Sequence, residues 1–345
     1  MKWRRVALAA VAAVWAGTTW WHTVKALPPG TALASQVCRV PQQELGFVAD
    51  ITAADAYGRA VVSQGIFEEV LRVIGAARRF IVLDYTRFGP DAAHSGQRRL
   101  ASALTDALLA RRRELPQLQV LFITDPASDA FGTPGSVELQ VLRAAGVNVV
   151  PVNLDLLRDS NLLYSGLWRL ALQWWDGPRG AFGAAARRLN FKADGRKLIL
   201  ADDGAGGLSA VVGSANPQDR ESAWSNLAAR VHGAALAELL ASELEVARFS
   251  GWRGADSAFG VTAAPACPDG SPDDTHARVQ LLTEGAIRTA LLEHFAAAAR
   301  GDAIEVAAFH LADRGVVESL LDAARRGVDV RLILDPNEDA AGLPN

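Results

Sequence analysis

Short apolar runs of strand length alternate with amphipathic helical segments along much of this chain, and this alternation limits the possible folds most strongly. Three runs have the length and composition of buried strands: 80–83, 119–124 and 147–152. Three segments beside them have the apolar spacing of helices: 64–77, 95–113 and 136–145. Helices that alternate with strands usually cover the faces of one sheet. We therefore expect an α/β fold with a mixed β-sheet flanked by helices.

Composition limits the class of partner. The chain has 345 residues, of which 50% are hydrophobic and 21% charged, so it is long and apolar enough to bury a large core. Lysine and arginine number 35 against 38 aspartate and glutamate residues. A dedicated nucleic-acid binder normally carries a basic excess, so we expect no nucleic-acid partner.

The N-terminus predicts a membrane segment. Residues 1–5 include the basic Lys2, Arg4 and Arg5, and an apolar run over 6–21 follows, which is the pattern of a signal peptide or signal anchor. Trp20 and Trp21 suit the headgroup level of a bilayer, and the basic start favours a cytoplasmic N-terminus. We expect an uncleaved anchor with the body on the extracytoplasmic, periplasmic side. Cleavage after Ala34 would instead give a secreted protein.

An internal repeat predicts two related lobes. The segment 125–132 recurs as 335–342, an offset of 335 − 125 = 210, and each copy follows a strand that follows a helix. The same offset places a second copy of Lys197 at 197 + 210 = 407, so we expect the printed sequence to be part of a longer one. The predicted organisation is an anchor or signal peptide, an extracytoplasmic linker, a first lobe, an inter-lobe linker and the start of a second lobe, at 1–25, 26–62, 63–252, 253–280 and 281–345.

The chemistry of the first lobe concentrates in two neighbouring segments. Residues 195–202 read Gly-Arg-Lys-Leu-Ile-Leu-Ala-Asp, and residues 213–216 read Gly-Ser-Ala-Asn. Both begin or end a predicted strand, and the turn-rich 202–207 joins those strands into a hairpin. The hairpin should present Lys197 and Asn216 at one sheet edge.

These segments resemble the His-x-Lys, four residues, Asp and Gly-Ser-x-Asn motifs of the phospholipase D superfamily. The match comprises Lys197, Asp202, Ser214 and Asn216, whereas glycine stands at position 195 in place of histidine. Other segments resemble a bacterial, membrane-anchored, cardiolipin synthase-like branch of that superfamily: 27–30, 123–126, 157–161, 189–193 and 331–337. The resemblance implies a phospholipase D-like lobe, with one complete lobe and the start of a second.

The resemblance also implies roles for the matched residues. A phosphodiester transition state spreads negative charge over oxygens, which preorganised donors stabilise. We therefore expect Lys197, Ser214 and Asn216 to hold the substrate phosphate, and the catalytic set to be Lys197, Asp202 and Asn216, with Asp202 orienting its neighbours. In the family, a histidine from each lobe attacks phosphorus or protonates the leaving alcohol, and glycine can do neither.

Further departures from the family pattern cluster in this lobe. Asp194 precedes Gly195 where asparagine is expected, and Gln218 and Trp224 stand where this branch carries further histidines. A carboxylate beside the phosphate site would repel an anionic substrate. The first half-site is therefore predicted to be impaired.

The remaining histidines give one weak candidate. His310 ends a strand of the second copy and could serve as a replacement acid, although a rim or capping role is the preferred interpretation. His232 caps or packs at a helix start, and His94 lies in a polar loop.

The two cysteines, Cys38 and Cys267, have no ligand spacing of a structural zinc site, so we expect no metal or cofactor. They could form a disulfide in an oxidising compartment, or remain two buried thiols. The aromatic-rich stretch 162–175 has helical spacing and could dip into a lipid interface, but core packing is preferred.

Two classes of function remain. The first is a phosphodiesterase or phosphatidyltransferase that acts on phospholipid through a two-lobe site. Its activity would be impaired because glycine replaces histidine at position 195 and because the second motif is missing from the printed sequence. The second is a catalytically silent, membrane-tethered protein that binds phosphate headgroups or a protein partner. A nuclease-like phosphodiesterase is a lesser alternative, and the oligomeric state is left open.

Overall fold

The computed structural model describes residues 2–90, 98–126, 136–173, 189–190, 192–260 and 275–335. The chain forms two compact units. The first comprises Met1–Thr31 and Ser35–Leu281, and the second comprises Ala32–Ala34 and Leu282–Asn345.

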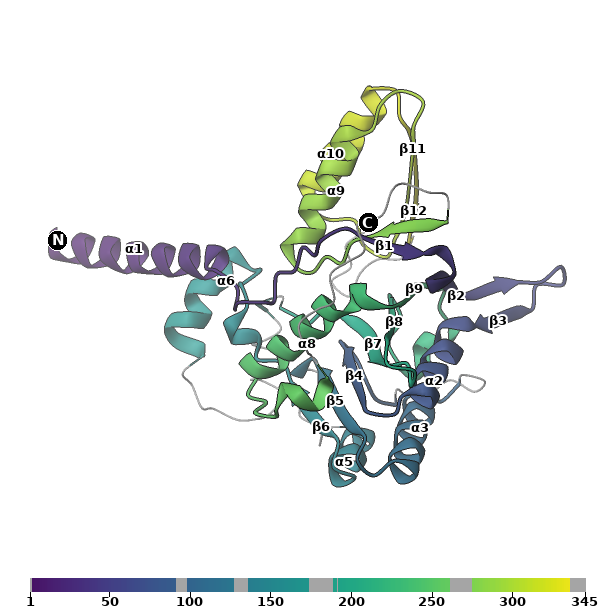
Figure 1. The fold of residues 1–345 in the computed structure, drawn as a ribbon. Coiled ribbons are helices and arrows are strands. Elements are labelled where there is room, and N and C mark those ends of the chain that lie inside the picture. The colour runs from purple at the N-terminus through teal and green to yellow at the C-terminus, as the bar shows by residue number, and fades with distance from the viewer. Residues whose placement is uncertain are drawn as a thin grey trace. The chain divides into compact units, whose positions relative to one another are not determined.

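The first unit is built on a mixed sheet of eight described strands in the order β3-β2-β9-β8-β7-β4-β5-β6 (Figure 1). The β4–β5 and β5–β6 pairs are parallel, and the other neighbours are antiparallel. The strands are β2 (Leu45–Ala54), β3 (Ala60–Gln64), β4 (Phe80–Tyr85), β5 (Gln119–Thr124), β6 (Asn148–Pro151), β7 (Lys197–Asp202), β8 (Leu208–Gly213) and β9 (Asn226–His232).

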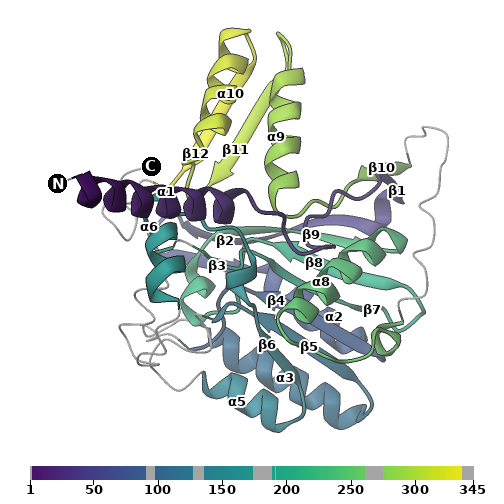
Figure 2. The same ribbon diagram turned by 90° about the vertical axis from the view of Figure 1, so that its left-hand side faces the viewer.

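Helices cover both faces of this sheet (Figure 2). One face packs against α2 (Gly65–Ala76), α3 (Leu100–Glu114) and α5 (Val137–Ala144), and the other against α8 (Ala237–Phe249). The central strand β4 is buried on both faces, because alternate residues contact opposite helical layers. The expected α/β class, a mixed sheet flanked by helices, is confirmed.

The predicted helices and strands of the first unit agree with the observed elements apart from their ends. The largest difference is α3, predicted from Ser95 and observed from Leu100; residues 95–97 lie outside the described part. The Asp219 carboxylate accepts from the Ala101 amide at 3.2 Å, and the Ser222 hydroxyl accepts from the Arg98 amide at 3.1 Å. The helix start is thus capped by a distant loop, which local sequence cannot reveal.

Residues 45–64 differ from the expectation. Most of this segment was predicted as part of the linker 26–62, but it forms the hairpin β2–β3 at an edge of the main sheet. Asp55 accepts from the backbone amides of Tyr57 and Arg59, and Gly58 has a positive φ of 76°. This turn chemistry closes the hairpin, so the first lobe begins before residue 63.

A second antiparallel pair joins β1 (Cys38–Pro41) to β10 (His276–Val279) within the first unit. Cys38 is buried on β1, whereas Cys267 lies outside the described residues, as does any pairing between them.

The second unit repeats the start of the first. Its order is α9 (Gly285–Ala297), β11 (Ala303–Ala308), α10 (Arg314–Arg325) and β12 (Asp329–Leu334), matching α2, β4, α3 and β5. Both β11–β12 and β4–β5 are parallel pairs. The repeat inferred at 335–342 lies outside the described residues except for Asp335.

Helix α1 (Lys2–Val24) extends from the first unit and contacts α6 (Leu162–Leu167), which continues into a π-helical turn at Trp168–Leu172. Over the described residues, no helix combines the length and apolar character needed to span a bilayer.

Candidate functional site

The motif residues lie where β4, β7 and β8 meet at one end of the sheet. Lys197 begins β7 and pairs in register with Tyr85, the last residue of β4. Asn216 follows the end of β8, the other neighbour of β7. The predicted hairpin β7–β8 is confirmed, and it brings Lys197 and Asn216 to the same end of the sheet.

Lys197 is half-buried and hydrogen-bonds to two neutral acceptors. Its Nζ donates to the Thr86 hydroxyl and to the Gly195 carbonyl, both at 3.2 Å. Within the described residues no carboxylate lies at ion-pair distance from this ammonium. Burial lowers the pKa of Lys197, and the charges of Glu221 and Asp194 oppose that shift. Since an ammonium has three N–H donors, one remains for an external acceptor.

Asn216 is buried and held on both sides. Its Oδ1 accepts from the Arg87 amide at 3.0 Å, and its Nδ2 donates to Glu221 at 2.8 Å. Glu221 also accepts from the Asn216 backbone amide at 2.6 Å. Asn216 therefore ties the loop after β4 to the loop after β8 and fixes the surroundings of Lys197.

Ser214 is exposed and is bonded across to β9. Its hydroxyl donates to the Asn226 side chain at 2.8 Å and accepts from the Leu227 amide at 3.2 Å. A phosphate contact from Ser214 would require this hydroxyl to exchange its Asn226 partner. Its predicted phosphate-binding role stays a prediction.

Asp202 lies at the opposite end of β7, about 16 Å from Lys197 for an extended strand. Its buried carboxylate accepts backbone hydrogen bonds of 2.8 to 3.2 Å from residues 78, 79 and 80, where the chain passes from α2 into β4. The structure thus separates Asp202 from the other motif residues. Its carboxylate instead holds the backbone between α2 and β4 in place.

Gly195 is exposed at the position of the missing histidine. A Cβ built on this residue meets no atom within 4 Å, and the backbone is not in the left-handed region. Neither packing nor backbone geometry therefore requires glycine here.

A buried group of carboxyls lies behind the site, on the α8 side of the sheet. It consists of Asp84 on β4, Asp194 before β7 and Glu243 on α8. Arg196 is the cation of this group, and its guanidinium pairs with Glu243 at 2.7 Å and donates to the Thr31 carbonyl at 2.9 Å.

Burial raises the pKa of Asp84 well above its ordinary value, and Asp194 and Glu243 raise it further. Burial also raises the pKa of Asp194. The Asp194 backbone amide donates to Asp125 at 2.7 Å, which fixes the segment entering β7. Because a raised pKa favours the neutral acid, the repulsion expected from Asp194 toward an anionic substrate is weakened.

The predicted histidine sites lie elsewhere. His232 ends β9 opposite Ser209, at the far end of β8 from Ser214. His310 is exposed after β11 in the second unit, against the Phe309 ring. His94 lies outside the described residues. Gln218, where a family histidine was expected, pairs with Gly89 in an isolated bridge. The replacement-acid role of His310 stays a prediction.

The described residues contain no cluster of three or more His, Cys, Asp and Glu side chains arranged to hold a metal ion.

Sequence reasoning missed several residues of the site. Thr86 and Arg87 directly follow the buried strand β4, the position from which parallel strands present functional groups, and Glu221 follows Asn216 by five residues. Asp84 and Glu243 carried no local signal, because only the tertiary fold brings their carboxyls beside Asp194.

Comparison with known proteins gives one line of support, for the fold. No protein-family model matches the sequence, and no curated protein matches it. The structure is similar to that of a phosphatidylserine synthase from Haemophilus influenzae Rd KW20, with a TM-score of 0.50 and 9% sequence identity. The match covers 87% of this chain and 64% of the synthase chain, so the chain spans less than two thirds of that protein. At this identity the likeness shows a shared mixed α/β fold and nothing finer.

Proposed function

We propose that this chain acts on phospholipid through a phospholipase D-type site, in which the first lobe holds the phosphodiester with Lys197 but supplies no nucleophile. The observation that carries the proposal is the state of Lys197: a half-buried ammonium with two neutral acceptors, one unused donor and no carboxylate within ion-pair distance among the described residues. A phosphodiester oxygen would supply both the missing acceptor and the missing charge.

The surroundings of Lys197 support phosphate binding. Arg87 is exposed beside it, and Asn216 keeps one amide N–H beyond the one donated to Glu221. The pKa of Glu221 is raised by burial, although its hydrogen bonds from Asn216 oppose that shift. A raised pKa favours the neutral form of Glu221, which weakens its competition with an anion for Lys197.

The proposal assigns phospholipid rather than nucleic acid as the substrate. The net charge of −3 gives no basic excess for a polynucleotide backbone. Helix α1 with its basic start supports association with a membrane. The structural neighbour is itself described as a phosphatidylserine synthase.

Binding without turnover is the second candidate, and a specific observation favours it. Gly195 offers no side chain, and the adjacent Asp194 carboxyl is buried with Asp84 and Glu243 rather than directed to a substrate. Catalysis would then depend on a histidine from outside this lobe. Without one, the site would hold a headgroup and release it unchanged.

A single set of assays separates these candidates. The protein and its Lys197→Ala variant would be tested for hydrolysis of a chromogenic phosphodiester and of labelled phospholipid vesicles, and for binding of short-chain phospholipid below its micellar concentration. Arg113→Ala, which removes an exposed cation from α3, is the matched control. A loss of turnover of at least a hundredfold in Lys197→Ala supports catalysis. If the wild type shows no turnover, a loss of headgroup binding in Lys197→Ala supports the binding role. Equal binding by all three proteins, with no turnover, would refute both.

The Gly195→His variant tests the missing nucleophile directly. The open space at this position predicts that the variant folds with unchanged stability. In a protein with a working second motif, we expect turnover to rise at least tenfold, and Lys197→Ala in the same background to abolish the gain. No gain in Gly195→His, alone or combined with Asp194→Asn and Gln218→His, would contradict an impaired half-site.

A further inference from the structure

Helices α1 and α6 pack against each other at a glycine. A Cβ added to Gly166 would overlap Trp15 and Thr19 of α1, so only glycine permits this approach. Thr19 and Ser165 are buried at the same crossing. The close contact places α1 and α6 side by side.

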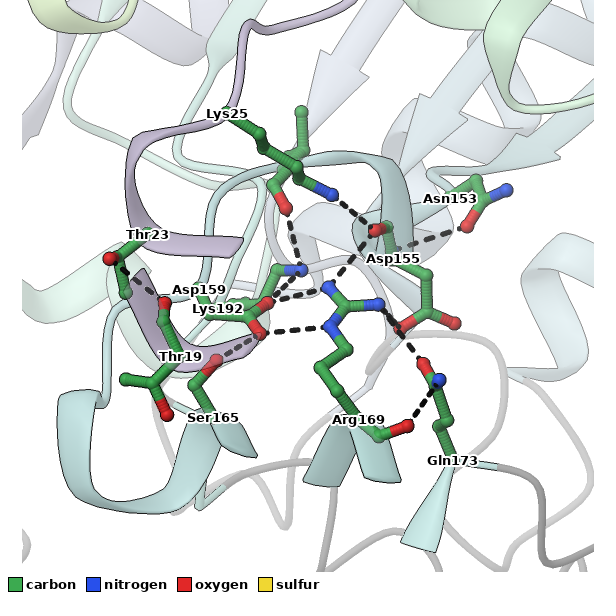
Figure 3. A network of polar contacts seen from close by, with 11 residues as sticks. Thr19, Thr23, Lys25, Asn153, Asp155, Asp159, Ser165, Arg169, Gln173 and Lys192 are labelled. Atoms are coloured by element: carbon green, nitrogen blue, oxygen red, sulfur yellow. Dashed lines mark hydrogen bonds and ion pairs between the residues drawn. The ribbon is translucent and has the colours of Figure 1, made fainter. Parts of the chain in front are cut away.

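A polar network fixes the C-terminal end of α1 onto the segment around α6 (Figure 3). Asp159 accepts from Arg169 at 2.6 Å and from Lys192 at 2.9 Å, and its backbone amide donates to the His22 carbonyl at 3.0 Å. The Lys25 ammonium donates to the Asp155 carbonyl at 2.9 Å. Because Asp159 and Arg169 are buried, this network holds the two helices in one arrangement.

Large apolar side chains surround the helix crossing and face solvent. On α6, Leu163 is 82% exposed and Leu162 61%, whereas Trp168 of the same segment is buried. Core packing was preferred for the stretch 162–175; it holds for Trp168 and is wrong for these leucines, and Trp174 and Trp175 lie outside the described residues. The exposed residues, called here the helix-pair surface, are Trp20, Trp21, Val24, Leu162, Leu163, Leu167 and Leu170.

The two helices of this surface carry cations and no carboxylate, and the partly exposed Asp155 lies in the network beside them. Neither α1 nor the segment 162–172 contains an aspartate or glutamate, while Lys2, Arg4 and Arg5 begin α1 and the exposed Arg158 precedes α6. Tryptophan at the border of an apolar patch suits the headgroup region of a bilayer. Apolar side chains on helices that carry cations and no carboxylate suit an anionic lipid surface, because the headgroups compensate the charge and the acyl region takes the leucines.

We infer that the helix-pair surface docks onto an anionic phospholipid bilayer, so that α6 contacts lipid together with α1. The N-terminal helix is then not a simple tether on a free body. The rigid junction at Gly166 and Asp159 sets a fixed orientation of the first unit on the membrane. This contact is independent of Lys197 and of the proposed chemistry.

The test compares two charge insertions of equal spacing in the otherwise unchanged chain. Leu163→Glu with Leu167→Glu places two carboxylates on the exposed face of α6, and Val137→Glu with Val141→Glu places two on the exposed face of α5. Binding to vesicles of phosphatidylcholine with a quarter phosphatidylglycerol is measured by cosedimentation and by the blue shift of tryptophan emission. We expect the α6 pair to weaken binding at least tenfold and the α5 pair to leave it unchanged.

Equal binding by the wild type and the α6 pair would overturn the inference and leave α1 as the whole contact. Equal loss in both pairs would also overturn it, since the effect would then come from net charge alone. If the glutamate pair fails to fold, Leu163→Ala with Leu167→Ala replaces it, because alanine adds no charge and keeps the helix intact. This alanine pair should also weaken vesicle binding, and unchanged binding would contradict the proposal. The α6 pair should still bind short-chain phospholipid below its micellar concentration as the wild type does, so failure of the proposed function is distinguishable.

Discussion

Asp84 is the residue whose environment is hardest to reconcile with its charge. Both of its carboxylate oxygens are buried without a hydrogen-bond donor among the described residues, and the neighbouring groups are the carboxyls of Asp194 and Glu243. Three carboxyls face one guanidinium, that of Arg196, so full ionisation would leave buried negative charge uncompensated. Proton retention by this group is the simplest way to lower that charge.

The wild type is expected to lose stability as pH rises because of Asp84, and the Asp84→Asn variant is expected to lack this loss. The folded protein binds the Asp84 proton more tightly than the unfolded chain does, because burial raises the pKa. The stabilising contribution is therefore complete below the unfolded pKa and decreases as pH rises toward the folded pKa, by about 1.4 kcal/mol for each pH unit. The neutral amide lacks this dependence. Urea unfolding at pH 5, 7 and 9 should show the variant gaining stability relative to the wild type as pH rises.

Asp106→Asn, at an exposed position on α3, is the control for this measurement. If the unfolding free energies of the wild type and Asp84→Asn differ by the same amount at pH 5 and at pH 9, Asp84 does not hold a proton.

At the scale of elements, the alternation of helices and strands was predictable because each element of the first unit buries its own apolar face. The edge hairpin β2–β3 was not, since its strands carry exposed apolar residues and do not alternate cleanly. The site was predictable in part: Lys197 and Asn216 lie at the same end of the sheet because both flank the β7–β8 hairpin. The contributions of Arg87 and Glu243 come from elements distant in sequence, and no local pattern predicts such contacts.

Asp202 connects two of these elements, and its predicted effect is on folding. Alanine at this position would remove the acceptor of three amides, a buried one at Phe80 and part-buried ones at Arg78 and Arg79. We expect Asp202→Ala to lower the free energy of unfolding by about 3 kcal/mol, because each buried amide without an acceptor costs about 1–3 kcal/mol. Lys197→Ala, with its weaker neutral contacts, should change stability by about 0.5 kcal/mol or less.

Denaturant unfolding of the two variants measures this difference, and Asp202→Asn, which keeps one acceptor oxygen, should lie between them. An Asp202→Ala protein of wild-type stability would show that the backbone contacts contribute little and would return Asp202 to a chemical role.

At the scale of the whole molecule, the two units have separate apolar cores. Among the described residues, the first unit buries two large clusters, one on each face of its sheet, besides a small one at Cys38, and the second buries a small cluster around Phe295, Val316 and Leu320. The repeated order of elements in the second unit could be anticipated from the sequence repeat. The smaller buried core of the second unit could not be anticipated, because the repeat indicates the order of elements and not how far each one is buried.

Separate cores predict two thermal transitions, with the second unit unfolding at the lower temperature because it buries less apolar surface. Leu320→Ala should lower only the first transition, and Leu104→Ala, in the fully buried core of the first unit, only the second. Each substitution removes about 2–5 kcal/mol from its own unit. Calorimetry of the whole chain measures both, and a single transition shifted equally by either variant would show that the units unfold together.

The open position of Gly195 has a consequence for how sequences like this one can change. Folding places no demand on the side chain at that position, so a codon change there can add or remove a reactive group without altering the yield of folded protein. A saturation library at position 195 should accordingly give soluble protein for nearly every substitution, while a library at Gly166 should tolerate almost none with α1 still docked. Activity at the first position could thus be lost and regained in single steps, with selection acting on chemistry alone.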